Sequence, residues 1–152
     1  MDTLFSVLHV VGAVFIVGPM SILPMTALRA LRAGNGPQVS TLAKSTALFS
    51  YLSLIVFILG FALVGMADPK YHLSVTTPWV LWSIIAYALA IILSLALVVP
   101  ALRRAAGRAA DRSTARTAPA SPTPAGYAII SAGSGAVSLL LLLVVVLMVW
   151  KP

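Results

Sequence analysis

The chain has 152 residues, of which 61% are hydrophobic and 9% are charged. A soluble domain carries about 25% charged residues, so this composition excludes an ordinary soluble protein and predicts one whose solvent is lipid. The sequence contains no cysteine, which excludes disulfides, thiolate metal sites and cysteine nucleophiles. The formal net charge of +7 is interpreted below from the positions of the charges.

Four apolar runs predict the architecture. The first, residues 4–23, is long enough to cross a hydrocarbon core of about 30 Å as a helix. Runs of similar length follow at residues 47–67, 79–99 and 127–150. We therefore predict an all-α integral membrane four-helix bundle that forms a single membrane domain over residues 1–152. Because no basic segment precedes the first run, we expect it to be retained rather than cleaved as a signal peptide.

The connections between the runs predict the orientation. Eight of the ten Lys and Arg residues lie in the first and third connections, residues 24–46 and 100–126. Short connections rich in Lys and Arg remain in the cytoplasm. We therefore expect two basic cytoplasmic loops and both termini outside. The expected location is the cell membrane, as a multi-pass protein of a bacterial inner membrane.

The first connection predicts a helical hairpin. Helical composition continues to Arg32, stops at Gly34-Asn35-Gly36, and is followed by Pro37, which suits the first turn of a new helix. Within the first run, Pro19 lacks an N–H group and its ring crowds the carbonyl of Phe15, so we also expect a kink there.

The third connection predicts contact with anionic lipid. Four of its five arginines recur every four residues, so a helix would place them on one face. Each basic residue near an anionic headgroup surface contributes about 1 kcal/mol, and docking of a specific partner or lipid headgroup is the alternative. The segment that follows is rich in proline, and we expect a flexible cytoplasmic loop over residues 100–126. Since membrane topology explains the positive charge, we expect no nucleic-acid partner. The five residues are Arg103, Arg104, Arg108, Arg112 and Arg116.

Small residues in the runs predict where helices pack. Helix association in lipid depends on small residues that let two backbones approach closely. We expect such contacts within the chain, with a second copy, or with a larger membrane complex. The candidate glycines are Gly12, Gly60, Gly65, Gly133 and Gly135.

His9 is the one His, Asp, Glu, Lys or Arg inside the four apolar runs. An ionisable group at that depth indicates a functional site, and the alternative is a neutral imidazole bonded to a hydroxyl or carbonyl of a neighbouring helix. Its orientation would need an acceptor, for which Ser6, Ser83, Tyr87 or a backbone carbonyl are candidates. His72 lies in the second connection, on the same predicted side. Together the two could bind a metal or the axial positions of a haem, although His72 is more simply a solvated loop residue.

The segment Leu8–Gly18, with its LHxxGA…G pattern, and the basic end of the same helix, Ala27–Arg32, carry a resemblance. This helix resembles the first helix of the DUF2269 family of uncharacterised four-helix integral membrane proteins. It is more distantly similar to CopD-like copper-resistance proteins and HemJ-type protoporphyrinogen oxidases. In the haem-associated relatives the first-helix His is a ligand or an essential residue, which would correspond to His9. The chain departs from them at Pro19, which replaces a second small residue.

Three function hypotheses follow from these features. We favour a non-catalytic accessory or scaffolding membrane subunit, because the three acidic residues all lie outside the apolar runs. The alternative is a haem- or copper-binding protein that uses His9. A third hypothesis is an oligomeric transporter, which one His and no intramembrane acid support less well.

The orientation is testable with single-cysteine variants, because the chain has no cysteine of its own. In intact cells, Ala33→Cys and Ala120→Cys should resist a membrane-impermeant thiol reagent and should react after the membrane is opened. Labelling of either position from outside in intact cells would reverse the predicted orientation.

Overall fold

The computed structural model describes residues 2–66, 74–114 and 126–150. Within these ranges the regular structure is entirely helical, so the predicted all-α fold is confirmed. Two five-residue π-helical turns, η1 and η3, interrupt the first and third long helices. The elements in chain order are α1 (Asp2–Gly12), η1 (Ala13–Val17), α2 (Gly18–Arg32), α3 (Gly36–Gly65), α4 (Pro78–Leu93), η3 (Ser94–Val98), α5 (Val99–Thr114) and α6 (Tyr127–Trp150).

Four continuous helices are long and apolar enough to span a membrane, as predicted: Thr3–Arg32, Gly36–Gly65, Pro78–Asp111 and Tyr127–Trp150. The third helix is longer than its apolar run because α5 continues it to Thr114. Residues 100–114 are thus helical and do not belong to the flexible loop expected over residues 100–126. The alanine-rich composition of α5 explains the difference, because alanine has the highest helix propensity. The proline-rich part of that loop lies outside the described residues.

The turn between the first two long helices is as predicted. Gly34 has a φ of +70°, a left-handed conformation that glycine adopts without steric cost. Asn35 then caps α3, because its side-chain oxygen accepts a hydrogen bond from the backbone N–H of Gln38 at 3.1 Å. Pro37 occupies the first turn of α3, where its missing N–H costs no helical hydrogen bond.

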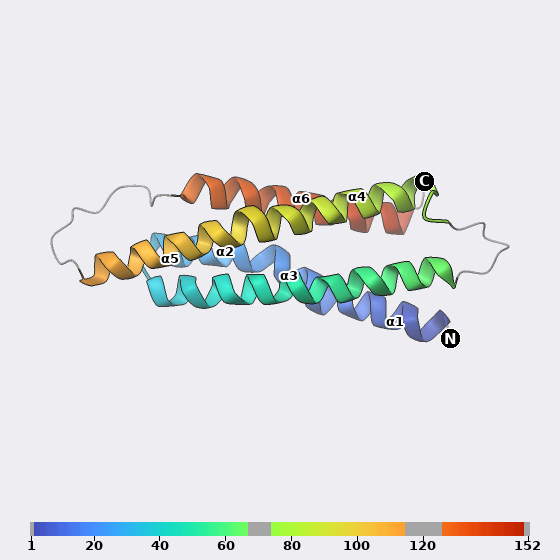
Figure 1. Ribbon diagram of the computed structural model, residues 1–152, viewed down its shortest axis with the longest axis horizontal. Coiled ribbons are helices and arrows are strands. Elements are labelled where there is room, and N and C mark those ends of the chain that lie inside the picture. The colour runs from blue at the N-terminus through green and yellow to red at the C-terminus, as the bar shows by residue number, and fades with distance from the viewer. Residues whose placement is uncertain (1, 67–73, 115–125, 151–152) are drawn as a thin grey trace.

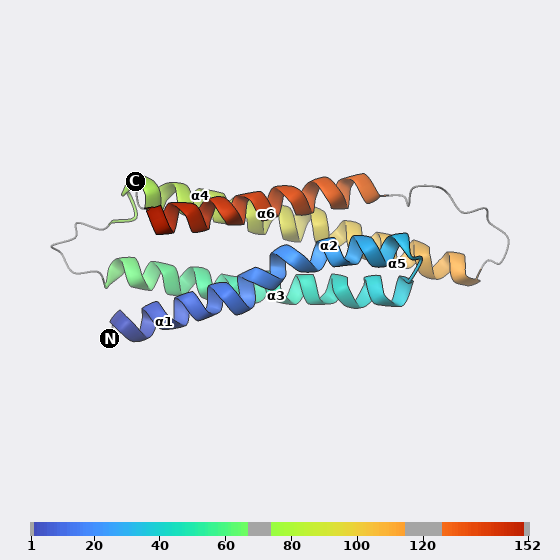
Figure 2. The same cartoon turned by 180° about the vertical axis from the view of Figure 1, so that it is seen from behind.

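Both π-helical turns precede a proline by two residues. Val17 ends η1 before Pro19, and Val98 ends η3 before Pro100. A proline inside an α-helix has no N–H to donate to the carbonyl four residues earlier. In a π-helical turn the backbone N–H groups bond carbonyls five residues earlier instead of four, so the pairing of backbone groups near the proline changes. The irregularity expected at Pro19 is thus a π-helical turn over Ala13–Val17, just before the proline, and the first helix bends there (Figure 2).

The helices form an elongated bundle in which α1 and α3 lie side by side, as do α4 and α6 (Figures 1 and 2). The start of α1 and the end of α6 lie at one end. The opposite end, which we call the basic end, holds the α2–α3 turn and α5, with Arg29, Arg32, Lys44 and Arg103. The first long helix is more deeply buried toward the basic end: none of residues 3–19 is buried, whereas Met20, the next residue, is fully buried.

Hydroxyl groups tie the long helices together inside the bundle. Ser50 on α3 and Ser94 in η3 share a hydrogen bond at 2.8 Å. The Tyr87 hydroxyl of α4 donates to the Ser53 carbonyl of α3 at 2.7 Å, and its ring stacks on Phe57 with the centroids 5.1 Å apart. Each bond gives a polar group in an apolar surrounding the partner that lipid does not provide.

Glycine allows a close approach between α6 and the third helix. A Cβ atom added at Gly133 would lie 3.0 Å from Val98 Cγ2 and 3.3 Å from Leu97 Cδ2. A Cβ added at Gly135 would meet no atom within 4 Å. The two glycines lie two positions apart, on roughly opposite faces of α6, and only Gly133 faces the third helix.

This difference predicts opposite effects on stability. Gly133→Leu should destabilise the fold by about 1–3 kcal/mol, because the new side chain overlaps Val98 and Leu97. Gly135→Leu is the matched control and should leave the free energy of unfolding nearly unchanged or raised, since leucine is also the better helix former. Unfolding of both variants in detergent, followed by circular dichroism, checks this. Equal stability of the two variants would contradict the packing at Gly133.

Candidate functional site

His9 lies on α1 against the C-terminal third of α3, beside Val56 and Gly60. Its Nδ1 atom is 3.0 Å from the carbonyl oxygen of Val56, and the side chain is half-buried. A carbonyl oxygen can only accept, so Nδ1 carries the proton in this hydrogen bond. The contact is thus a hydrogen bond from the imidazole to a neighbouring backbone, one of the partners expected from the sequence.

Two glycines let α1 and α3 approach at this point. A Cβ added at Gly12 would lie 2.8 Å from Val56 Cγ2, and one added at Gly60 would lie 3.1 Å from His9 Cε1. On each helix the glycine is one turn from the residue that makes the hydrogen bond, so both fall on the facing surfaces. The imidazole edge therefore rests on the glycine backbone of α3, and a larger residue at position 60 would displace it.

The hydrogen bond fixes which ring nitrogen is left for other chemistry. With Nδ1 donating to Val56, the neutral imidazole keeps a lone pair on Nε2. A histidine that binds a metal usually donates its other N–H to a carbonyl or a carboxylate in this way. The geometry is therefore compatible with a packing residue and with a single axial ligand.

The other candidate partners of His9 are placed elsewhere. Ser83 donates to the Trp79 carbonyl and Tyr87 to the Ser53 carbonyl. Ser6 is exposed on α1. His72 and Tyr71 lie outside the described residues. Among the described residues, no three His, Cys, Asp or Glu side chains gather where they could hold a metal ion. Of the two histidines predicted to bind a metal or a haem, the described residues thus include His9 alone.

The predicted lipid-contacting arginines are distributed along α5. Arg103, Arg104 and Arg108 are exposed on its surface. Arg112 lies in α5, in the part of that helix whose side chains are not described, and Arg116 lies outside the described residues. The bundle also places a basic residue of α2 at this end: the Arg32 guanidinium donates to the Tyr127 hydroxyl and lies 4.7 Å from the centre of its ring.

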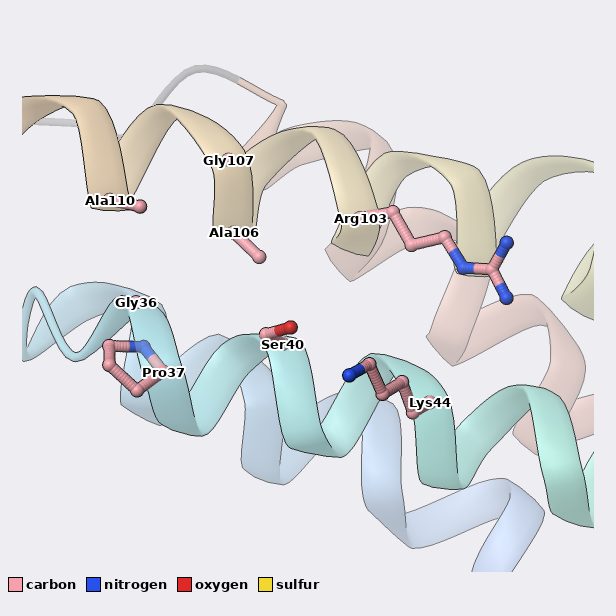
Figure 3. A pocket seen from close by; sticks show the side chains of 8 residues that line it. All are labelled: Gly36, Pro37, Ser40, Lys44, Arg103, Ala106, Gly107 and Ala110. Carbon is pink, nitrogen blue, oxygen red and sulfur yellow. The ribbon is translucent and has the colours of Figure 1, made fainter.

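One feature of the basic end was not predicted from the sequence. Lys44 of α3 and Arg103 of α5 line the same groove, between two helices that are distant in the chain (Figure 3). The sequence placed these residues in two separate basic connections. Nothing in their local patterns showed that α3 and α5 are neighbours, so only the packing brings the two cations together.

Comparison with known proteins adds the family. The profile of a family described as "Predicted integral membrane protein (DUF2269)" matches residues 3–152. The chain belongs to the DUF2269 family. The resemblance carried by the first helix is thereby confirmed for this family, and so is the integral, multi-pass membrane character of the protein. No curated protein and no solved structure matches the chain.

Proposed function

We propose that this DUF2269 protein is an accessory or scaffolding subunit of the cell membrane that associates with itself or with a larger membrane complex. The observation that carries the proposal is the use of its polar side chains. Among the described residues, no buried side-chain nitrogen or oxygen lacks a hydrogen-bond partner. Catalytic and transport sites keep polar groups directed at a substrate, whereas here the buried hydroxyls bond either to a carbonyl of their own helix or to a group of a neighbouring helix.

The hydrogen bonds between helices occur at several positions along the bundle. Ser21 of α2 donates to Ser138 of α6 at 2.8 Å, and Ser50 pairs with Ser94 at the same distance. The hydrogen bond from His9 to the Val56 carbonyl links α1 and α3 in the half of the bundle that holds the start of α1. A unit tied in this way is suited to present a fixed surface to a partner, because its helices cannot slide without breaking bonds that lipid would not replace.

A face of α6 offers such a surface. A Cβ atom added at Gly135 would meet no atom within 4 Å, and the side chains of Leu139, Leu142 and Val146 are 69%, 59% and 43% exposed. Spacings of four, seven and eleven residues place these three on the same face as Gly135. Glycine at one end of an apolar face lets a second helix approach closely, which supports association through α6.

The orientation belongs to the same proposal. With the basic end in the cytoplasm, the exposed arginines of α5 meet anionic lipid headgroups, and the start of α1 and the end of α6 lie outside. The positive-inside rule supports this arrangement, because the end of α2, the first third of α3 and α5 together carry seven of the ten Lys and Arg residues. A bacterial inner membrane is the expected location.

Association through α6 predicts the effect of filling the Gly135 position. Gly135→Leu should shift the protein from oligomer toward monomer in a mild detergent, as measured by light scattering after size-exclusion chromatography, because the new side chain separates the helices. Val145→Leu is the control, since Val145 is exposed on another side of α6. If the wild type and Gly135→Leu both run as monomers, self-association through this face is wrong.

A second candidate function is haem binding through His9. It is favoured by one observation, the Nδ1 hydrogen bond to Val56 that leaves the Nε2 lone pair for a ligand. The described residues supply one axial position, and the bound group would bring electron-transfer chemistry near the end of the bundle that holds the start of α1. The chain itself would orient the imidazole through α3 and exclude water with the surrounding apolar side chains.

The absorption spectrum and metal content of protein purified from its own host decide between the two candidates. A haem protein should show a Soret band that is lost in His9→Ala and kept in Val10→Ala, a change at a neighbouring exposed position. A colourless, metal-free protein whose His9→Ala variant still folds would reject the haem function and leave His9 as a helix-packing residue.

A further inference from the structure

A groove of about 450 Å³ runs between α3 and α5 at the basic end (Figure 3). Its wall consists of small residues and two cations. No acidic side chain is among the eight residues that line it, so no carboxylate of the lining offsets the two positive charges. The lining residues are Gly36, Pro37, Ser40, Lys44, Arg103, Ala106, Gly107 and Ala110.

Glycine and alanine determine the shape of the groove. At one end the two backbones nearly touch, since a Cβ added at Gly36 would lie 3.2 Å from the backbone nitrogen of Ala110. Further along α5, a Cβ added at Gly107 would meet no atom within 4 Å. The groove is therefore closed by close helix packing near Gly36 and has open space beside Gly107.

The two cations stand at the end of the groove nearer the apolar spans. In Figure 3 the Lys44 ammonium extends back toward Ser40, and the Arg103 guanidinium extends toward the spans. Both side chains are exposed. Both cations border the groove, and an anion bound in it would be attracted to each of them. Guanidinium and ammonium groups together are a common means of binding phosphate.

The surroundings of the groove favour a lipid over a free anion. On α3, residues four and seven positions beyond Lys44 are Leu48 and Tyr51, which are 56% and 60% exposed. These spacings place them on the same face as Lys44, one and two turns into the apolar span. An acyl chain could lie along this face while its headgroup reaches the cations. A free phosphate would use the cations alone.

We propose that the groove binds the phosphate headgroup of an anionic phospholipid, held by Lys44 and Arg103, with an acyl chain along Leu48 and Tyr51. Basic pockets between membrane helices are suited to such headgroups. This is a site for one lipid molecule, which differs from the diffuse attraction expected of an exposed arginine stripe. It also goes beyond the accessory function proposed above, because it would exist whether or not the protein associates with a partner.

The test uses the full chain, delipidated in a neutral detergent. The apparent affinity for phosphatidylglycerol is measured from the rise in thermal unfolding temperature, with phosphatidylcholine and inorganic phosphate as comparison ligands. Lys44→Ala/Arg103→Ala should weaken phosphatidylglycerol binding roughly thirtyfold, from about 1 kcal/mol for each cation. Arg29→Ala, compared with Lys44→Ala and with Arg103→Ala singly, is the charge-matched control, because Arg29 is exposed, does not line the groove and is not one of the α5 arginines.

A third variant separates the groove from the charges. Gly107→Leu keeps every cation and fills the open space, and it should fold because its Cβ meets no atom. It should lose binding as the double variant does, while the wild type should bind neither phosphatidylcholine nor phosphate with comparable affinity. Equal binding by the groove variants and the control would overturn the site in favour of general charge attraction. Equal binding of inorganic phosphate would overturn the lipid as its occupant.

Discussion

The fold depends on one constraint: inside a hydrocarbon core, each polar group of the chain has to find its partner within the protein. The four long helices satisfy the backbone, and the side chains satisfy one another. Ser50 with Ser94, Tyr87 with the Ser53 carbonyl, and His9 with the Val56 carbonyl are all consequences of the same requirement. In water each of these bonds would compete with the solvent and contribute little; in lipid an unmade bond is the larger cost.

A second constraint is the distance between helices. Lipid gives no hydrophobic advantage to one apolar helix contact over another, so close packing has to come from shape. Gly12, Gly60 and Gly133 each stand where a neighbouring side chain would meet an added Cβ. Two of the three lie at the contact between α1 and α3, where Gly12 of α1 faces Val56 and Gly60 of α3 faces His9. The imidazole hydrogen bond and the glycine contacts therefore depend on each other, because the bond forms only at the separation that the glycines permit.

The two ends of the bundle differ in ways that bear on function. Toward the start of α1, none of residues 3–19 is buried, so this part presents itself to its surroundings more than it packs within the chain. At the basic end, Gly36 brings α3 against α5, and Lys44 and Arg103 face one groove. A scaffold that holds one end rigidly and leaves the other open to neighbours agrees with the accessory function. The π-helical turns before Pro19 and Pro100 interrupt the first and third long helices, and the first helix bends at its turn.

The sequence by itself determined the properties that depend on residues close together in the chain. The length and hydropathy of the apolar runs predicted the four membrane helices, and the residues from Gly34 to Pro37 predicted the first turn. The apolar sequence around His9 indicated a candidate functional residue. Only the tertiary structure decided which helices are neighbours, because helix packing in lipid depends on matched surfaces that no local pattern encodes. It therefore gave His9 the Val56 carbonyl rather than Ser83 or Tyr87, and brought Lys44 to Arg103. Residues 100–114 form a helix where a loop was expected, and the reason is local. The high helix propensity of the alanines favours a helix although the segment is rich in charged residues.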